Sequence, residues 1–396
     1  MGKQVIVSVR IVGLLAILVA GLGWAADGAE NAPPAAVASV SSPSTTTTNY
    51  PGHEGHRYFE QTATLDLGPV TYGIKYCACI DDAHAPDVGN LEGYLGMPLP
   101  HACNWYHGGF MRIVINGQDV GLARLSSMAA VESGERAIVD FVWHHQLADV
   151  RARFLGLPGE DRIYCEVAIE PKQEIRSIEV PLVCYPSFFT AWHGRNGARR
   201  VRTPAALVVE GEKQALPANE NWWAVYYDEV FDIARHEGEG PCAMLVLPTE
   251  AQEVHFQPQS YPCLTTIVFS PSARRLRMAF WDFVDRTNAD VLAAMPEEAA
   301  QARRFLETAD FTPAGFRLVG AAETLAEVEE ALKRPEVREQ LGAKADEIEK
   351  WLADTRPLLA DTALQQTIAG QERLAVAVQR FNEFVWELKI AELLDF

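Results

Sequence analysis

The chain changes its pattern of hydrophobic and polar residues twice along its length. Between residues 58 and 288, short runs alternate hydrophobic with polar positions and are rich in β-branched and aromatic residues. A period of two places successive side chains on opposite faces of a β-strand. The strands that this pattern predicts are Thr62–Leu67, Val70–Cys77, Phe110–Ile115, Ala137–Trp143, Val150–Leu155, Ile163–Ile169, Ser177–Tyr185, Trp222–Tyr227, Cys242–Leu247, Leu264–Phe269 and Leu276–Phe283.

Turn signals separate these runs. Asn116-Gly117, between Phe110–Ile115 and Asp119–Ala123, is the strongest hairpin signal, and Leu157–Asp161 is a second turn built on proline and glycine. No long amphipathic helix lies between the runs, which disfavours a parallel α/β sheet. Residues 58–288 are therefore predicted to form a large antiparallel β-sandwich, similar to a supersandwich.

Residues 289–396 are rich in Ala, Glu, Leu and Arg and are predicted to form a C-terminal helical domain. The predicted boundaries are an N-cap at Thr287-Asn288, a non-helical connection over Phe311–Leu318, a capping box of Thr324 and Glu327, Pro335 in the first turn of a helix that runs to about Ala353, and a break at Pro357.

A hydrophobic stripe follows the last helical segment. Its members recur at spacings of four and three, which places them on one helix face: Leu374, Val378, Phe381, Val385 and Leu388. The stripe is either a coiled-coil or oligomer seam or an ordinary packing face. It is short for a coiled coil, which favours the packing face and leaves the oligomeric state open.

The first residues have the pattern of a secretory signal peptide. Lys3 and Arg10 precede the apolar stretch Ile11–Leu22, and small residues precede Ala26. Residues 1–25 are predicted to be cleaved on export, so the mature protein is expected to be secreted or periplasmic. An uncleaved membrane anchor is the alternative, although the apolar run is short for one. Residues 26–57, rich in Ala, Pro, Ser and Thr, are predicted to be a disordered linker.

Composition then narrows the classes of function. Of 396 residues, 48% are hydrophobic, and 34 Lys and Arg stand against 53 Asp and Glu, giving a net charge of −19. The hydrophobic fraction excludes a disordered chain, and the acidic balance argues against nucleic-acid binding. No second apolar run is long enough to span a bilayer, which excludes a polytopic membrane protein.

Seven cysteines follow the predicted signal peptide: Cys77, Cys79, Cys103, Cys165, Cys184, Cys242 and Cys263. Export permits disulfides, and an odd number leaves at least one thiol unpaired. Cys165, Cys184 and Cys242 lie in apolar strand runs and are predicted to be buried thiols. Cys77 and Cys79 lie two apart on a strand, so they are expected to face the same side without bonding to each other.

The first candidate binding region is the long segment 81–109, which has little helical or strand period. Such loops are functional when they are not disordered, and this one is rich in aromatic residues. Its candidate ligand-binding residues are Trp105, Tyr106 and His107. A zinc site of His101, Cys103 and His107 is the alternative, but that spacing matches no regular zinc pattern. We therefore predict no metal and no cofactor.

A second candidate is the loop over residues 186–197. Trp192, His193 and Arg195 are predicted to bind a sugar, because an aromatic face stacks on the apolar face of a pyranose while polar neighbours bind its hydroxyl groups. His193 is also a candidate general acid or base near neutral pH. The alternative is a surface loop whose aromatic residues cover the edge of the sandwich.

The third candidate is the strand that ends in Asp228 and Glu229. Strand alternation is expected to send Trp222 and Tyr227 to opposite faces. Asp228 and Glu229 are candidate catalytic acids, although adjacent strand residues point in opposite directions and make a poor pair. Further acidic candidates are Asp282 and Asp285.

The strand succession from Ala137 to Phe189 resembles part of the large β-sandwich of galactose-mutarotase-like proteins, which also occurs in some polysaccharide lyases and glycoside hydrolases. The segments that carry the resemblance are AIVDFVWHH, VRARFLGLPGEDRIYCEVAIEP and IRSIEVPLVCYPSFF. The resemblance implies a carbohydrate-associated fold. Mutarotases use a His and a Glu as acid and base, but neither matches a position here, and fold alone does not decide function.

Three hypotheses follow from the sequence. The first is an exported protein that recognises a glycan through loop aromatics without catalysis. The second is a carbohydrate-active enzyme (a hydrolase, lyase or epimerase) that uses a His and a carboxylate in a cleft of the sandwich. The third is a structural exported protein that assembles through its helical tail.

Overall fold

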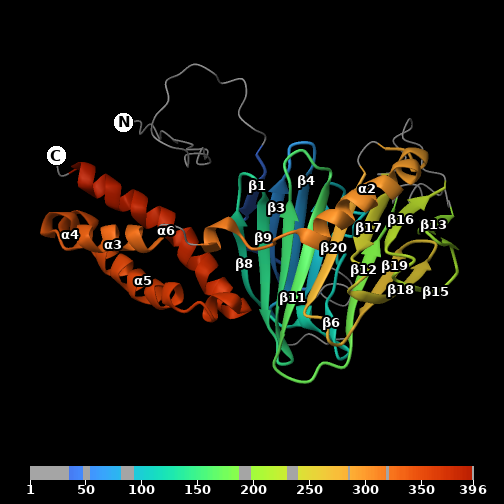
Figure 1. Cartoon of the computed structure of the whole chain (residues 1–396), viewed down its shortest axis with the longest axis horizontal. Helices are drawn as coiled ribbons and strands as arrows, with labels where there is room; N and C mark the ends of the chain where they lie inside the picture. The colour runs from blue at the N-terminus through green and yellow to red at the C-terminus, as the bar shows by residue number, and fades with distance from the viewer. Residues whose placement is uncertain are drawn as a thin grey trace, which may run out of the picture. The chain divides into compact units, whose positions relative to one another are not determined.

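The computed structural model describes residues 35–47, 54–81, 93–186, 198–229, 240–283, 286–317 and 321–394. The predicted signal peptide, residues 1–25, lies outside these ranges. Every strand pairing in the described part is antiparallel, and the helices gather at the C-terminal end, as the sequence predicts (Figure 1).

One layer is a sheet of nine strands. In spatial order they are β14 (Leu207–Val209), β13 (Arg199–Arg202), β16 (Trp223–Asp228), β17 (Cys242–Val246), β20 (Arg275–Asp282), β11 (Arg162–Pro171), β10 (Ala148–Gly156), β9 (Ala137–His144) and β8 (Leu125–Glu132). Its central strands are buried on both faces, because the second layer covers one face and helical segments cover the other.

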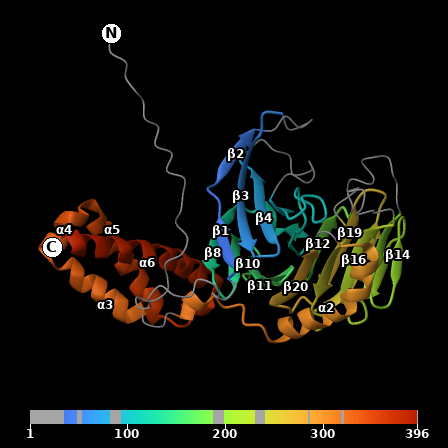
Figure 2. The ribbon, with the colours of Figure 1, turned by 90° about the horizontal axis from the view of Figure 1, so that it is seen from above.

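The second layer combines two smaller sheets. The first contains β1 (Val37–Val40), β2 (Ser44–Thr47), β3 (Arg57–Asp66), β4 (Thr71–Cys79) and β5 (Tyr94–Leu99). The second contains β15 (Gln214–Pro217), β18 (Ala251–Pro258), β19 (Cys263–Phe269), β12 (Ile178–Cys184), β6 (Val114–Ile115) and β7 (Gln118–Asp119). Isolated bridges from Met111 to Leu95 and to Leu182 join them. Figure 2 shows the two layers from above.

The main hydrophobic core lies between these layers. Strand β12 shows how the sequence builds it, because its side chains alternate strictly between buried and half-buried positions. Ile178, Val180 and Leu182 enter the core, where they meet residues of the nine-stranded sheet such as Phe154 and Phe280. Alternation of this kind fixes the register, since a slip by one residue would expose every apolar side chain.

The predicted turns are confirmed. Asn116 and Gly117 adopt φ values of 52° and 76° and connect β6 to β7, which is the backbone that a two-residue hairpin turn requires. The second strand of this hairpin is shorter than predicted, because the 3₁₀-helix η1 (Val120–Leu122) follows it directly. Gly159 closes the β10–β11 turn with a φ of 79°.

Two expectations for loops and one for a strand are corrected. Residues 37–40 and 44–47 of the expected linker form β1 and β2, which hydrogen-bond to opposite ends of β3. Residues 94–99 of the expected long loop form β5, which pairs with β4. Most of the predicted strand Phe110–Ile115 lacks regular pairing, and only Val114–Ile115 is a strand.

Helix α2 (Asn288–Thr308) belongs to the sandwich, not to a separate helical domain that begins at residue 289. Thr287 is its N-cap and accepts a hydrogen bond from the Asp290 amide, as predicted. Val291 and Met295 pack with Trp223, Val225 and other outward-facing side chains of the nine-stranded sheet. The helix therefore covers the outer face of β16, β17 and β20 (Figure 1).

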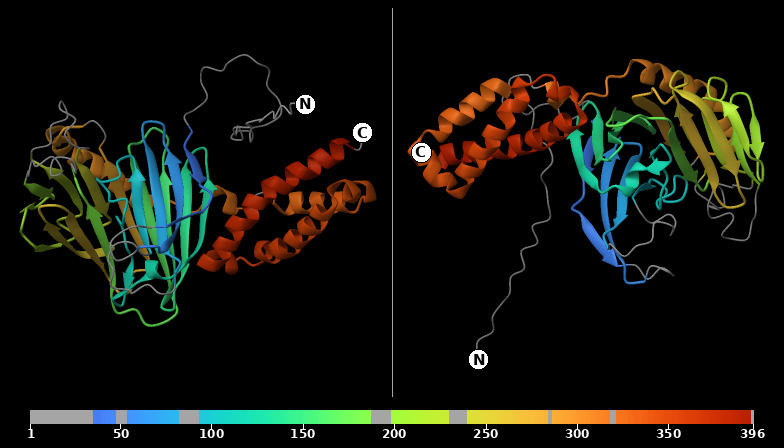
Figure 3. Two further views of the ribbon diagram at one scale, coloured as in Figure 1. Left: turned by 180° about the vertical axis from the view of Figure 1, so that it is seen from behind. Right: turned by 90° about the horizontal axis from the view of Figure 1, so that it is seen from below.

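The remaining helices pack against one another (Figure 3) and share a hydrophobic core of their own. They are α3 (Ala321–Leu332), α4 (Pro335–Leu341), α5 (Ala343–Ala360) and α6 (Ile368–Leu394), with the short η3 (Ala314–Arg317) and η4 (Leu364–Gln366). Pro335 begins α4 as predicted, but Gly342, at a φ of 55°, ends that helix early. Thr324 lies inside α3 and Pro357 inside α5, so neither marks a boundary.

The stripe on α6 is a packing face where it is described. Leu388 and Val385 join the core that α3, α4, α5 and α6 share, here called the helical layer, whereas Leu374 packs with Leu358 near Ala129 of β8.

The seven cysteines all lie in described residues and none forms a disulfide. Cys165, Cys184 and Cys242 are buried as predicted, which fits their apolar surroundings.

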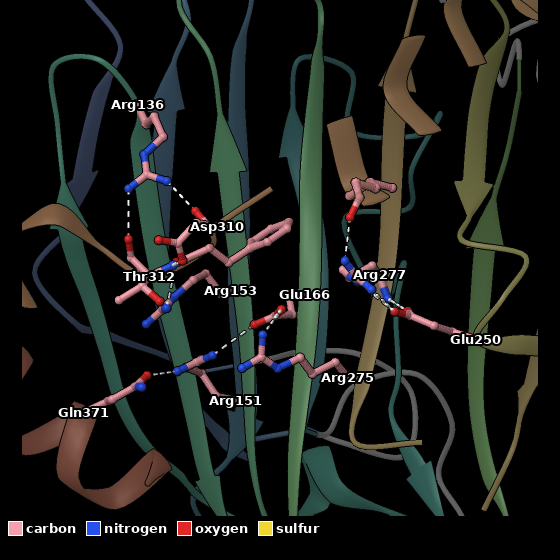
Figure 4. Close-up of polar contacts among 12 residues, drawn as sticks. Arg136, Arg151, Arg153, Glu166, Glu250, Arg275, Arg277, Asp310, Thr312 and Gln371 are labelled. Atoms are coloured by element: carbon pink, nitrogen blue, oxygen red, sulfur yellow. Dashed lines mark hydrogen bonds and ion pairs between the residues drawn. The ribbon is translucent and has the colours of Figure 1, made fainter. Parts of the chain in front are cut away.

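Arginines hold the covering segments on the outer face of the nine-stranded sheet (Figure 4). Arg277 donates to the Leu306 carbonyl in the last turn of α2 at 2.6 Å, where a cation also favours the helix dipole. Arg153 donates to the Phe311 carbonyl at 2.8 Å, and Arg136 donates to the carbonyls of Asp310 and Thr312. The connection after α2 is thus bound through its backbone.

Candidate functional site

A groove of about 620 Å³ lies on the outer face of the nine-stranded sheet, beside α2. Its walls come from β16 and the residue before it, from the turn between β13 and β14, and from the first half of α2. The lining residues are Arg202, Thr203, Pro204, Leu207, Trp222, Trp223, Tyr227, Leu292 and Pro296. Aromatic and aliphatic groups thus form most of the wall, which is typical of a small-molecule or sugar site.

The aromatic wall follows from the start of β16. Trp223 and Tyr227 lie four residues apart on the strand, so both face outward toward α2. Trp222 precedes the strand and therefore does not obey its alternation, which corrects the expectation that Trp222 and Tyr227 face opposite ways. Trp222 and Tyr227 are half-buried, so each keeps part of its ring surface open to the groove.

Hydrogen bonds fix the turn that forms the opposite wall. The Thr203 hydroxyl donates a hydrogen bond to the side-chain carbonyl of Asn221 at 2.6 Å and accepts one from the Ala206 amide at 2.9 Å. Asn221 in turn donates to the Pro217 carbonyl. These buried contacts join the β13–β14 turn to the residue before Trp222, so both walls of the groove are held by one polar network.

The charged side chains of β13 divide between its two faces. Arg199 points inward and forms a fully buried ion pair with Asp228, its register partner on β16. Arg200 and Arg202 point outward on the side of Tyr227. Arg200 lies 2.7 Å from Glu229, whereas Arg202 is exposed at the edge of the groove.

These pairs bear on the two predicted catalytic acids. Asp228 is fully buried against Arg199 and does not reach solvent, which does not fit the role of a catalytic acid. Glu229 is exposed but bound to Arg200. The two carboxylates point to opposite faces, as the sequence predicts for adjacent strand residues.

The three predicted ligand-binding residues of segment 101–107, which are Trp105, Tyr106 and His107, do not share one environment. Trp105 is fully buried in the main core and donates to the Trp281 carbonyl at 2.8 Å, so it is a core residue and not a ligand contact. Tyr106 and His107 are half-buried, with ring centres 4.9 Å apart. The Tyr106 ring contacts the Tyr185 ring edge to face, and the Tyr185 ring contacts that of the exposed Tyr261 in the same way, so the three rings form a row.

His101 and Asp282 form a pair that the sequence does not single out. The His101 Nδ1 atom lies 2.9 Å from Oδ1 of the fully buried Asp282, and the Asn104 amide donates to the same oxygen at 2.8 Å. Burial raises the pKa of Asp282 above its usual range, although the His101 hydrogen bond opposes this shift. The contact with Asp282 orients the imidazole, which is partly exposed.

Sequence reasoning missed this pair because 181 positions separate its members. His101 was noticeable only as a possible zinc ligand, and Asp282 only as one acid among many. No periodic signal joins a loop histidine to the end of a strand. The remaining candidates, Trp192, His193, Arg195 and Asp285, lie outside the described residues.

The comparisons with known proteins give partial likenesses. No family model and no curated protein matches the sequence. Among solved structures, an alpha-N-acetylgalactosaminidase from Bifidobacterium bifidum in complex with GalNAc is similar over 71% of this chain and 41% of its own, with a TM-score of 0.39 and 10% identity. A GH36 alpha-galactosidase from Geobacillus stearothermophilus in complex with raffinose matches 56% of this chain and 40% of its own, with a TM-score of 0.30 and 11% identity.

A third structure is the galactosidase domain of an alpha-galactosidase-sucrose kinase. It matches 57% of this chain and 40% of its own, with a TM-score of 0.29 and 10% identity. The chain therefore spans about two fifths of the length of these structures. The resemblance to galactose-mutarotase-like domains stays a prediction of the sequence.

Proposed function

We propose that this protein is an exported glycan-binding protein whose ligand occupies the groove beside α2. The observation that carries the proposal is the pairing of Trp222 and Tyr227, two half-buried rings on one side of the nine-stranded sheet, with Arg202 at the rim. The export part of the proposal depends on the signal-peptide pattern of residues 1–25.

The groove has the chemistry that a sugar requires. A pyranose offers an apolar face of C–H groups, which stacks on an aromatic ring, and an equatorial belt of hydroxyl groups, which needs polar partners. Trp222 and Tyr227 supply rings that packing against α2 already holds in place, so little side-chain entropy is lost on binding. The groove is open to one side, which suits a segment of a chain rather than an enclosed small ligand.

A glycan array of residues 35–396 with the Trp222→Ala and Tyr227→Ala variants tests the proposal. Truncating a central aromatic contact is expected to weaken binding about tenfold or more. Tyr261→Ala is the matched control, because Tyr261 is an exposed ring on the row of ring contacts outside the groove. Binding that is lost in Tyr261→Ala but kept in Trp222→Ala would move the site to that row and overturn the proposal.

A second candidate function is catalysis on a carbohydrate, favoured by the His101–Asp282 pair. A buried carboxylate that orients a partly exposed imidazole is an arrangement found at general acid–base sites. The test is release of reducing sugar from any glycan that the array identifies, with the wild type and His101→Asn. Activity that is present in the wild type and absent in a folded His101→Asn variant selects this function, and binding without release rejects it.

A further inference from the structure

We infer that the glycan in this groove is acidic, with sugar carboxylates of the uronic acid type that bind Arg202. The inference rests on the proposed function, since it names the ligand class of the same groove. The protein carries a net charge of −19, yet Arg202 is the single charged residue among the nine that line the groove.

Arg202 differs from the other arginines around the groove. Arg199 is paired with Asp228, Arg200 with Glu229 at 2.7 Å, and Arg303 with Glu307 at 2.8 Å. Arg202 has no carboxylate partner within the described ranges of the chain, although it lies on the same outward face as Arg200. In a protein with this excess of acids, a groove arginine without an internal carboxylate fits a carboxylate that arrives with the ligand.

The nearby acidic side chains are engaged elsewhere. Glu297 and Glu298 follow Pro296 of the groove wall on α2. Glu298 binds Arg286 at 2.9 Å, and Glu297 accepts a hydrogen bond from Gln301 at 3.3 Å. Neither residue lines the groove. An anionic ligand beside Arg202 therefore meets no carboxylate from the groove wall itself.

Arg303, on α2, supports the binding of an acidic sugar by holding the Trp222 ring in place. Its guanidinium carbon lies 5.3 Å from the centre of the Trp222 ring, close enough for a cation–π contact. This contact restrains the Trp222 ring while Arg202 stays available for a planar, two-point hydrogen bond to a carboxylate. Stacking on Trp222 and Tyr227 would then hold the sugar ring, and Arg202 would select its acidic substituent.

The experiment compares two glycans that share a backbone. Polygalacturonate carries free carboxylates, and its fully methyl-esterified form carries none. Isothermal titration with the full chain is expected to give about tenfold or more tighter binding to polygalacturonate, the range of a hydrogen bond to a charged group. Arg202→Gln should bring the two affinities within about twofold of each other by removing that bond. Arg275→Gln, which removes an arginine that is 71% exposed on the same sheet, should leave the ratio unchanged.

Each result separates the two levels of the proposal. Equal binding of both polymers that Trp222→Ala abolishes would overturn the acidic ligand class and leave glycan binding in place. An array on which neutral glycans bind while polygalacturonate, alginate and hyaluronate do not would also overturn the acidic class. Loss of discrimination in Arg275→Gln as well as Arg202→Gln would show a general charge effect and reject the role of Arg202.

Discussion

The Nε2 atom of His144, the last residue of β9, lies 2.8 Å from the Glu372 carboxylate on α6. The other ring nitrogen, Nδ1, lies 2.6 Å from Asp149 on β10. Ionised carboxylates only accept hydrogen bonds, so both contacts are satisfied together only when the imidazole carries two protons. A protonated histidine thus joins the sandwich to the helical layer.

This geometry predicts a pH-dependent attachment of α6. Burial lowers the pKa of His144, but Asp149 and Glu372 outweigh it and raise the pKa above its ordinary value. The added stability is therefore complete below pH about 6.5 and is lost as the pH rises through the raised value. Because the ring is partly exposed, we expect less than about 1 kcal/mol. Hydrogen-exchange protection factors at residues 368–375, which correct for the faster intrinsic exchange at high pH, should be lower at pH 8.5 than at pH 5.5.

Neighbouring charges define the control for this prediction. Lys172 lies 2.5 Å from Asp149, Arg151 contacts Gln371, and Glu170 accepts the Ile368 amide at 2.8 Å. Arg151 stays charged across this pH range, because burial lowers its pKa only to about 10, whereas burial raises the pKa of the Glu170 carboxyl above its ordinary value. His144→Gln keeps a polar side chain without the titration, so its exchange should show much less of the change. An equal pH effect in that variant would assign it to another group.

Arg153 is predicted to be the most costly arginine to remove from the outer face of the sheet. It is buried, binds both Asp140 oxygens at 2.6 Å and holds the Phe311 carbonyl. Arg153→Leu leaves a buried carboxylate without its partner, which costs about 3–5 kcal/mol. Urea unfolding measures the loss. Arg275→Leu, at an exposed arginine 3.7 Å from Glu166, should change stability by less than about 0.5 kcal/mol.

Gly96 of β5 is predicted to be essential for the position of segment 101–107. A Cβ atom at Gly96 would lie 1.9 Å from the His107 carbonyl oxygen, so alanine there forces the two backbones apart. We expect Gly96→Ala to lower the melting temperature and to change the fluorescence of the buried Trp105. Gly117→Ala, at a turn with open space around it, should leave the Trp105 signal intact. An unaltered signal in Gly96→Ala would contradict this packing.

The thiols are predicted to react in a fixed order. Burial raises the pKa of Cys77 to about 11 and that of Cys184 and Cys263 far above the ordinary thiol value, which suppresses the reactive thiolate. Cys79 is half-buried at the end of β4. Iodoacetamide under native conditions should therefore label Cys79 first, as mass spectrometry can follow. Labelling of Cys184 before Cys79 would contradict the burial of that thiol.

Local signals in the sequence predicted the elements whose conformation is set locally. Asn116-Gly117 needs no tertiary contact to adopt a hairpin turn, and the alternation along Ile178–Cys184 reports directly which face is buried. Both predictions are confirmed. The helix ends instead at Gly342, whose φ of 55° stops α4, whereas the predicted break at Pro357 is wrong because α5 accommodates this proline in its last turn.

Features set by distant contacts were not predictable in this way. The Ser/Thr-rich residues 44–47 have no apolar face, and they form β2 only because the long strand β3 offers hydrogen-bonding groups beside them. The burial of Arg153 depends on Asp140 of β9 and on a carbonyl 158 positions away, and no local pattern reports either contact. The groove has the same origin, because α2 and the β13–β14 turn are far apart in sequence.

The arginines of the outer sheet face have a consequence for the way this chain can be altered. The connection after α2 is anchored at the carbonyl groups of Asp310, Phe311 and Thr312, and every amino acid carries a carbonyl. The strand arginines therefore fix much of its path, together with the buried Phe311 side chain and the Asp310 carboxylate, which accepts the Thr312 amide at 2.9 Å. We expect substitutions of the exposed Thr312 side chain to leave the backbone in place, because Arg136 binds its carbonyl group, so Thr312 is a natural location for a probe.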